Sequence, residues 1–239
     1  MSLADDPRLV VIRHADAEDW IEAVADEMAA ALEAGIAAQG RARMLLSGGT
    51  TPAPVYQALA ERELPWDRVE VSLADERWLS PQDRDSNAWL VRHSLLQRAE
   101  GVHFDPLVRV GKPIAECVHD ANLVARSAPT PSLLVLGMGN DGHTASLFPG
   151  ARELHRALAS KEPYAALDAT GCPVANQWPL RITLTPAGMA PIAHRLLLLR
   201  GAQKLEVLQA ALTYGDVNRH PILSALGSTQ TPLRVHWAP

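Results

Sequence analysis

The chain has 239 residues, of which 47% are hydrophobic and 21% charged, and its formal net charge is -5. This length and composition fit one large globular domain with a sizeable core. The negative balance argues against nucleic acid or an anionic membrane surface as the main partner, so an anionic ligand would need a local concentration of positive charge. No apolar run approaches the roughly 20 residues of a membrane-spanning helix. The first residues lack the basic and long apolar regions of a signal peptide, and we therefore expect a cytoplasmic protein.

Short apolar strands alternate with helices along the chain. Leu9 to Ile12 is a β-branched run, and Asp16 then caps a helix whose apolar residues recur at helical spacing until Gly40. Further strands are predicted at 43–46, 69–73, 133–136, 181–185, 195–199 and 235–237, and further helices at 52–62, from 86 or 87, at 115–126, 186–193 and 203–212. The alternation predicts a Rossmann-like α/β fold, in which a mostly parallel sheet carries helices on both faces and residues 1–239 form a single domain.

The stretch "LLVLGMGNDGHTASLFPG" contains Gly-x-Gly-x-x-Gly directly after a strand. A dinucleotide cradle needs a long helix after the third glycine and an acidic residue roughly 20 positions further on. Pro149 and Gly150 interrupt the chain too soon for that helix, which argues against a dinucleotide. The turn instead presents Asp141 and His143 at the carboxyl end of a strand. A histidine can take a proton from water while a carboxylate fixes its tautomer, although a helix cap beside an ordinary polar histidine would look the same.

A second glycine loop, Ser47-Gly48-Gly49-Thr50-Thr51, connects a strand to the start of a helix. Exposed backbone N–H groups, hydroxyl donors and the helix dipole together favour an anion there, most often a phosphate. The Gly-Lys-Ser/Thr ending of a nucleoside-triphosphate loop is absent, so a single phosphate fits better than a triphosphate. A plain tight turn is the alternative.

Several charged side chains follow predicted strands. Asp75 and Arg77 lie in "LADERWL", Arg181 opens "RITLT", and Lys204 follows "LLRGAQK", although each alone is also compatible with an ordinary surface charge. An arginine can hold a phosphate by a bidentate fork. The sequence has no Gly-x-Ser-x-Gly elbow, no His-Glu-x-x-His, and no cysteine spacing typical of a metal or a disulfide framework. These patterns favour a phosphate-holding site with an acid/base pair, no covalent nucleophile and no metal.

Together these residues resemble the 6-phosphogluconolactonase family, which belongs to a superfamily with glucosamine-6-phosphate deaminase. The matching stretches are "SGGTTP", "DERW" followed by "DSN", "GMGNDGHTASLFPG", "RITLTP", "RGAQK" and the closing "HP…LRVHW", from about residue 44 to 237. The deaminases typically continue differently after Asp-Gly-His and tend to carry Tyr where Arg77 stands here. Both differences favour the lactonase.

The resemblance implies hydrolysis of 6-phospho-D-glucono-1,5-lactone to 6-phosphogluconate in the oxidative pentose phosphate pathway, without a required cofactor. It implies His143 as the general base and Asp141 as the residue that orients it. Backbone N–H groups of the Gly139 to Gly142 turn, or a nearby cation, would stabilise the oxyanion. The residues expected to bind the substrate and its phosphate are Ser47, Gly48, Gly49, Thr50, Thr51, Asp75, Arg77, Asn140, Arg181 and Lys204.

The expected partner is a phosphorylated sugar lactone, and the chain is expected to be a monomer or a small homo-oligomer. A sugar-phosphate isomerase or deaminase on the same scaffold is the nearest alternative. A non-catalytic sugar-phosphate sensor is another, but it would normally bring a basic helix-turn-helix segment. The acidic stretch "DAEDWIEAVADEMAAALE" near the start of the chain speaks against it.

Overall fold

A computed structural model describes residues 3, 5–175, 177–227 and 231–239 of the chain. Within these residues, seven strands form the main sheet in the order β1-β10-β9-β6-β2-β3-β5, and every neighbouring pair is parallel. Their bounds are β1 (Leu9–Arg13), β2 (Ala42–Leu46), β3 (Val69–Leu73), β5 (His103–Phe104), β6 (Leu133–Leu136), β9 (Arg195–Arg200) and β10 (Leu233–Ala238). The predicted parallel, Rossmann-like sheet is confirmed. Strands β2 and β6 are buried throughout, which explains their mostly apolar sequences; Arg43 is the exception in β2 and pairs with Glu70.

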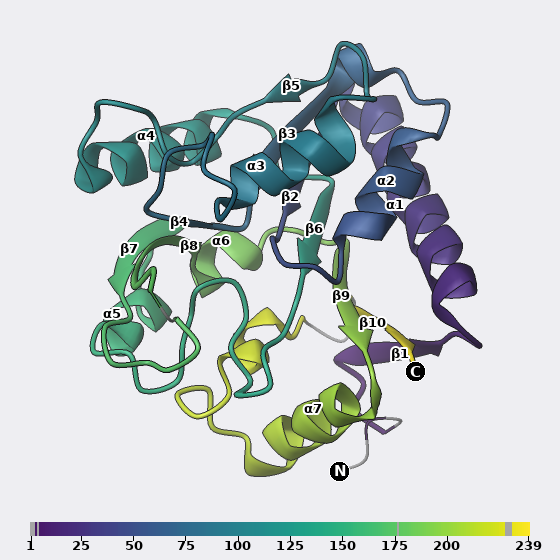
Figure 1. Cartoon of the computed structure of the whole chain (residues 1–239). Helices are drawn as coiled ribbons and strands as arrows, with labels where there is room; N and C mark the ends of the chain where they lie inside the picture. The colour runs from purple at the N-terminus through teal and green to yellow at the C-terminus, as the bar shows by residue number, and fades with distance from the viewer. Residues whose placement is uncertain (1–2, 4, 176, 228–230) are drawn as a thin grey trace.

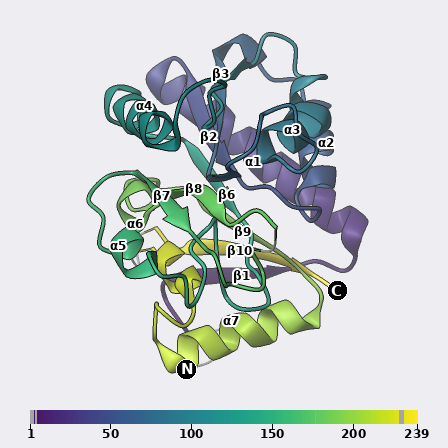
Figure 2. The same ribbon diagram turned by 60° about the vertical axis from the view of Figure 1, so that its left-hand side comes forward.

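Helices cover both faces of this sheet. Their bounds are α1 (Ala17–Gln39), α2 (Ala53–Ala60), α3 (Asn87–Val91), α4 (Ile114–Ser127), α5 (Leu154–Leu158), α6 (Pro186–Met189) and α7 (Ala202–Tyr214). Figures 1 and 2 show α1 and α7 on opposite sides of strands β9 and β10. Among the described helices, none is both long enough and apolar enough to span a membrane.

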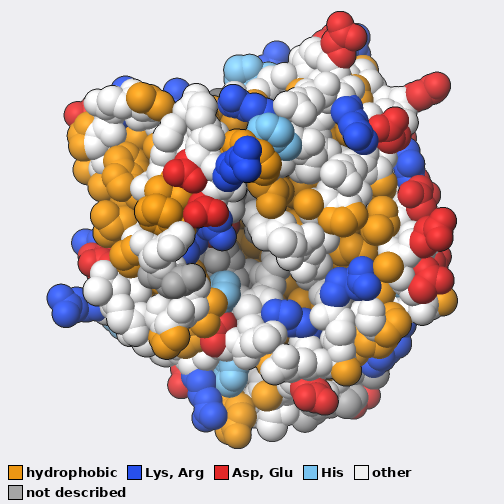
Figure 3. Space-filling view, in the orientation of Figure 1, with side chains coloured by type: hydrophobic (Ala, Val, Ile, Leu, Met, Phe, Trp, Pro, Cys, Tyr) orange, Lys and Arg blue, Asp and Glu red, His pale blue; other side chains and the backbone are white. Residues whose placement is uncertain are grey.

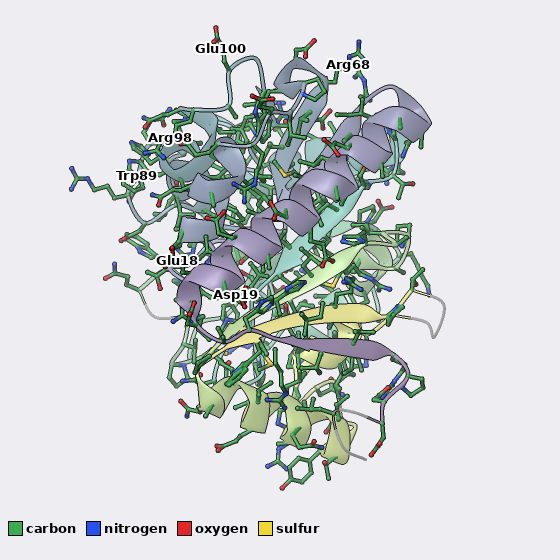
Figure 4. The ribbon with its side chains drawn as sticks, turned by 90° about the vertical axis from the view of Figure 1, so that its right-hand side faces the viewer. Glu18, Asp19, Arg68, Trp89, Arg98 and Glu100 are labelled. Carbon is green, nitrogen blue, oxygen red and sulfur yellow. The ribbon has the colours of Figure 1, made fainter. Side chains whose placement is uncertain are left out.

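Helix α1 begins and ends where the sequence predicts. The Asp16 carboxylate accepts hydrogen bonds from the backbone N–H groups of Glu18 and Asp19, each at 2.9 Å, so Asp16 caps the helix. Gly40 closes it with φ of 76°, in the left-handed region that favours glycine. Figure 4 shows α1 crossing the face of the sheet, with Glu18 and Asp19 at its amino end.

A second, smaller sheet was not foreseen. Strand β4 (Asp75–Arg77) pairs antiparallel with β8 (Leu180–Leu184), which pairs antiparallel with β7 (Tyr164–Asp168). The strand predicted at 181–185 is therefore β8, but it lies outside the parallel sheet. Of its two neighbours, β4 consists of three charged residues and gave no strand signal, whereas β7 is mostly apolar but no strand was predicted there. The pairing sets Arg77 directly opposite Arg181.

The helices near the glycine motif are shorter than ordinary crossover helices. After "GMGNDG" the next helix is α5, which begins at Leu154, so the expected absence of a long helix there is confirmed. The helix predicted at 186–193 ends at Met189.

The order of the strands determines where a ligand can bind. From β2 the chain moves outward to β3 and β5, and then returns to place β6 on the other side of β2. The connections at the carboxyl ends of β2 and β6 therefore diverge and leave a crevice, as expected at a switch point of an open parallel sheet.

Candidate active site

A cavity of about 270 Å³ lies in this crevice. Figure 3 shows the same side of the molecule as Figure 1, hollowed near its centre, with Lys and Arg side chains close to the hollow. Most of the predicted site residues line the cavity: Ser47, Gly48, Gly49, Thr50, Thr51, Asp75, Arg77, His143, Arg181 and Lys204. Asp141 stands behind His143. Asn140 is exposed and donates instead to the Gln203 side chain at 3.1 Å.

His143 and Asp141 form a tight pair at the end of β6. Nδ1 of His143 lies 2.6 Å from Oδ1 of Asp141, and the same oxygen accepts the His143 backbone N–H at 3.2 Å. Burial opposes ionisation of Asp141, but the hydrogen bond and charge of His143 outweigh it and lower the pKa of the carboxyl. The imidazole packs against Phe148, with ring centroids 4.7 Å apart. Because Nδ1 is engaged, Nε2 is the nitrogen able to exchange a proton with a molecule in the cavity.

The glycines of the motif make room for this pair. A Cβ atom on Gly139 would lie 2.1 Å from His143 Nδ1 and 2.4 Å from Asp141 Oδ1, and Gly142 has φ of 81°. The N–H of Gly139 donates to the His143 carbonyl at 2.9 Å, and that of Gly142 to the Gly139 carbonyl at 3.1 Å. Since both N–H groups are used within the turn, a nearby cation is the better candidate for stabilising an oxyanion.

The loop after β2 offers unused donors to the same cavity. Ser47 is held in place, since its N–H donates to Val135 and its carbonyl accepts the Tyr56 hydroxyl at 2.8 Å. The N–H groups of residues 48–51 donate to no other residue that the structure describes. Helix α2 starts at Ala53, directly after these groups. Free N–H groups at the amino end of a helix are suited to bind an anion, and the phosphate site predicted for this loop stays a prediction.

Arg77 and Arg181 face the cavity from the small sheet. Neither forms an ion pair with a carboxylate within the part of the chain that the structure describes. Arg181 is buried and donates to the carbonyls of Trp178 at 2.6 Å and Ala175 at 3.2 Å. Burial lowers its pKa, against the attraction of Asp75. Arg181 is thus a fixed charge, whereas Arg77 is held only through the Asp85 carbonyl and can still reach a ligand.

Lys204 reaches the cavity from the first turn of α7. Its Nζ donates to the Met138 carbonyl at 2.6 Å, beside the glycine turn. Burial lowers the pKa of Lys204, against the attraction of the Asp141 carboxylate. The ammonium group therefore stands next to the turn that carries the His143–Asp141 pair and retains two N–H donors for a ligand.

Asp75 and Glu76 have different environments although they are neighbours in β4. Asp75 faces the cavity, and its carboxylate accepts the Ser146 hydroxyl at 2.5 Å and the Asn87 amide at 3.3 Å. Glu76 points the other way and is 1% exposed. Burial raises the pKa of Glu76 to about 7, although three backbone N–H groups favour its carboxylate.

Sequence reasoning missed two polar side chains that line the cavity, those of Asn87 and Arg200. Asn87 follows Ser86, and either was expected to cap a helix; Ser86 is the cap, accepting the Trp89 N–H at 2.9 Å, which leaves the Asn87 side chain to the cavity. Arg200 ends β9, one residue beyond the predicted end of that strand. Its position at the carboxyl end of a strand was the available signal. Among the described residues, no group of three or more His, Cys, Asp or Glu side chains is suited to hold a metal ion.

The chain was compared with known proteins. A sequence model of the family described as "Glucosamine-6-phosphate isomerases/6-phosphogluconolactonase" matches residues 15–237. The chain belongs to this family. A protein of Xylella fastidiosa strain Temecula1 named 6-phosphogluconolactonase is 55% identical over 233 residues, which cover 98% of both chains. One from Pseudomonas aeruginosa with the same name is 38% identical, over 93% of this chain and 92% of the relative.

A solved structure agrees with these sequence matches. The crystal structure of a 6-phosphogluconolactonase from Shewanella baltica has a TM-score of 0.89 and 34% sequence identity, covering 97% of this chain and 98% of that one. In this member of the glucosamine-6-phosphate isomerase/6-phosphogluconolactonase family, an oriented imidazole therefore shares a cavity with free backbone N–H groups that are suited to bind an anion. That arrangement is able to activate water against a phosphorylated substrate.

Proposed function

We propose that this chain is a lactone hydrolase that converts 6-phospho-D-glucono-1,5-lactone to 6-phospho-D-gluconate in the oxidative pentose phosphate pathway. The observation that carries the proposal is the opening of one cavity to both the His143–Asp141 pair and the free N–H groups of the loop after β2. The relative from Xylella fastidiosa, named for this activity and 55% identical over nearly the whole chain, supports it. We propose that the chain acts as a single catalytic domain.

Binding comes first in the proposed mechanism. The phosphate occupies the N–H groups of the Ser47–Thr51 loop and is further held by Arg77. Arg181, which is fixed by protein carbonyls, adds positive potential without moving. The Asp75 carboxylate repels the phosphate and so would face the hydroxyl groups of the sugar. This division directs the lactone carbonyl toward the turn that carries His143.

Hydrolysis then follows in two steps. Nε2 of His143 takes a proton from water as the water oxygen bonds to the lactone carbonyl carbon, and the Asp141 carboxylate stabilises the imidazolium that forms. The ammonium of Lys204 stabilises the negative charge that develops on the carbonyl oxygen. The tetrahedral intermediate then reforms its C=O bond and breaks the bond to the ring oxygen, which receives the proton from His143. The product is the open-chain acid.

A His143→Ala variant tests both the activity and the role of the imidazole. With freshly generated lactone, and after subtraction of spontaneous hydrolysis, wild type should accelerate the reaction, and the variant should lose roughly 10²–10⁴-fold of that acceleration. Absence of acceleration by wild type would contradict the function. Full activity of the variant would contradict only the assigned base.

Two further properties extend the proposal. We place the protein in the cytoplasm, because its substrate is a charged phosphate ester that does not cross membranes unaided. We also propose that the protein is a monomer or a small homo-oligomer.

A further inference from the structure

Glu76 lies next to the cavity without entering it. It stands between Asp75 and Arg77 in β4, and because alternate residues of a strand point to opposite faces, its side chain is directed away from the cavity that those two line. It is 1% exposed. Among the described residues, no Lys, Arg or His side chain pairs with it. A buried carboxylate that has no cationic partner must be stabilised by other hydrogen-bond donors.

The partners of this carboxylate are backbone N–H groups. One oxygen accepts the N–H of Arg77 at 2.8 Å and that of Asn87 at 2.7 Å, and the other accepts the N–H of Ala88 at 2.8 Å. One side chain therefore ties β4 to the first residues of α3. Two of the three bonds, those from Asn87 and Ala88, join segments about ten residues apart that both supply cavity-lining side chains.

Asn87 carries this arrangement on to the glycine loop. Its amide nitrogen donates to the Asp75 carbonyl at 2.8 Å. Its amide oxygen sits against Gly48, where a Cβ atom would lie only 1.8 Å away. Glu76 thus holds the Asn87 backbone, the Asp75 carbonyl holds the Asn87 side chain, and that side chain packs against the loop proposed to hold the phosphate.

We propose that Glu76 is a positioning residue, whose carboxylate holds the backbone of Arg77 and Asn87 so that both side chains face the substrate. This inference rests on the proposed function. A carboxylate suits the task because it accepts several N–H groups and donates none. A carboxamide of the same shape would turn one acceptor into a donor facing an N–H, so that at least one buried backbone group loses its partner.

The test compares Glu76→Gln with Glu27→Gln, a matched control. Glu27 is a half-buried carboxylate on α1 that, like Glu76, is held by several hydrogen bonds, here from Arg234 and His236, and it does not line the cavity. E76Q should raise both the KM for the lactone and the Kd for 6-phosphogluconate about tenfold, with kcat within about threefold of wild type. E27Q should leave KM, kcat and Kd unchanged, whatever it does to the melting temperature.

A merely structural role for Glu76 gives a different result. E76Q would then resemble E27Q, with a lower melting temperature and unchanged KM and Kd, and that outcome overturns the inference. Glu76→Asp, which keeps an acceptor-only group, should recover part of the loss. If E76Q does not fold, Asn87→Ala takes its place, because it leaves the Glu76 hydrogen bonds intact. N87A should raise the Kd for 6-phosphogluconate, and an unchanged Kd in this variant would also overturn the inference. The Kd values are measured by calorimetry and require no turnover. A wild type that binds 6-phosphogluconate but hydrolyses no lactone would therefore overturn the proposed function, while the comparison of Kd between E76Q and E27Q would still test the role of Glu76.

Discussion

Replacement of Gly139 by alanine should inactivate the enzyme without unfolding it. The added Cβ atom would lie 2.1 Å from Nδ1 and 2.3 Å from Cε1 of His143, and 2.4 Å from Oδ1 of Asp141. Ordinary van der Waals contact begins at 3.4 Å, so the imidazole or the turn must move by about 1 Å. A displacement of this size at a reacting group costs about 10²-fold in rate, which corresponds to ~2.7 kcal/mol of transition-state stabilisation.

The assay is steady-state hydrolysis of fresh lactone by wild type, G139A and G137A. Gly137 belongs to the same motif, but nothing lies within 4 Å of the position that an added Cβ atom would take, and its backbone is outside the left-handed region. We expect kcat of G139A to fall about 100-fold with little change in KM, while G137A stays within about twofold of wild type. Equal kcat values for the two variants would refute the assignment of the motif's glycines to the His143–Asp141 pair.

Two further predictions concern cations and pH. Arg181→Ala should lower the free energy of unfolding by about 1 kcal/mol, because the Trp178 carbonyl loses its donor while the Ala175 carbonyl still accepts the Trp178 N–H. Lys204→Ala should lower kcat with little change in melting temperature, and circular dichroism and the lactone assay separate the two. Burial opposes ionisation of Glu27, but hydrogen bonds from two histidines and an arginine hold its pKa well below the usual value. The stabilisation from ionised Glu27 is therefore present above the unfolded pKa near 4.5 and is lost as pH falls below that value. Burial beside His236 lowers the pKa of His14, so the folded protein also loses stability as pH falls below 6.5, where the unfolded chain binds a proton at His14 more readily. The melting temperature of wild type should thus decline from pH 7 to 4, and that of Glu27→Gln should decline less steeply below pH 5. Equal slopes for the two proteins below pH 5 would contradict the stabilisation assigned to Glu27.

Features that arise within a short stretch of chain could be predicted from the sequence. The loop at residues 47–51 combines an apolar strand, two glycines and a helix start, and each of these is a local signal. The same holds for the turn that carries Asp141 and His143. The loop and the turn each follow the carboxyl end of a strand in the same parallel sheet. Because these strand ends lie at one edge of the sheet, the fold class predicts that the loop and the turn meet in one cavity.

The small sheet could not be predicted, because it depends on pairing between distant segments. Asp75–Arg77 is a strand of three charged residues, which no propensity scale favours, and it becomes one only through its register with Leu180–Leu184. The pairing also decides which side chains reach the cavity, since alternation sends Glu76 to the opposite face. Three charges in a row left open which of them would line the site; the family resemblance implied Asp75 and Arg77, and both do line the cavity.

Boundary errors explain the remaining omissions. The run "RLLLLR" predicts a strand to Leu199, yet the strand continues for one residue and carries Arg200 to the rim of the cavity. Asn87 was interpreted as a possible cap because Asn and Ser are both good caps, and only the observed bond from Trp89 to Ser86 assigns that task. In both cases an error of one residue in an element boundary decides whether the residue is predicted to have a structural role or to line the cavity.

The glycine motif matches a dinucleotide-binding pattern because a dinucleotide site and this turn both require space beside the backbone at the end of a strand, which glycine provides by lacking a Cβ atom. In a dinucleotide fold that space admits a pyrophosphate. Here the missing Cβ of Gly139 leaves room for an imidazole and a carboxylate from the chain itself, and that of Gly142 leaves room for His220, whose ring would lie 2.9 Å from an added Cβ. A ligand phosphate in that space would have to displace the pair that the Gly139 turn encloses. The pattern therefore specifies where the backbone opens, and the residues between and after the glycines, Asp141 and His143, determine the chemistry done there.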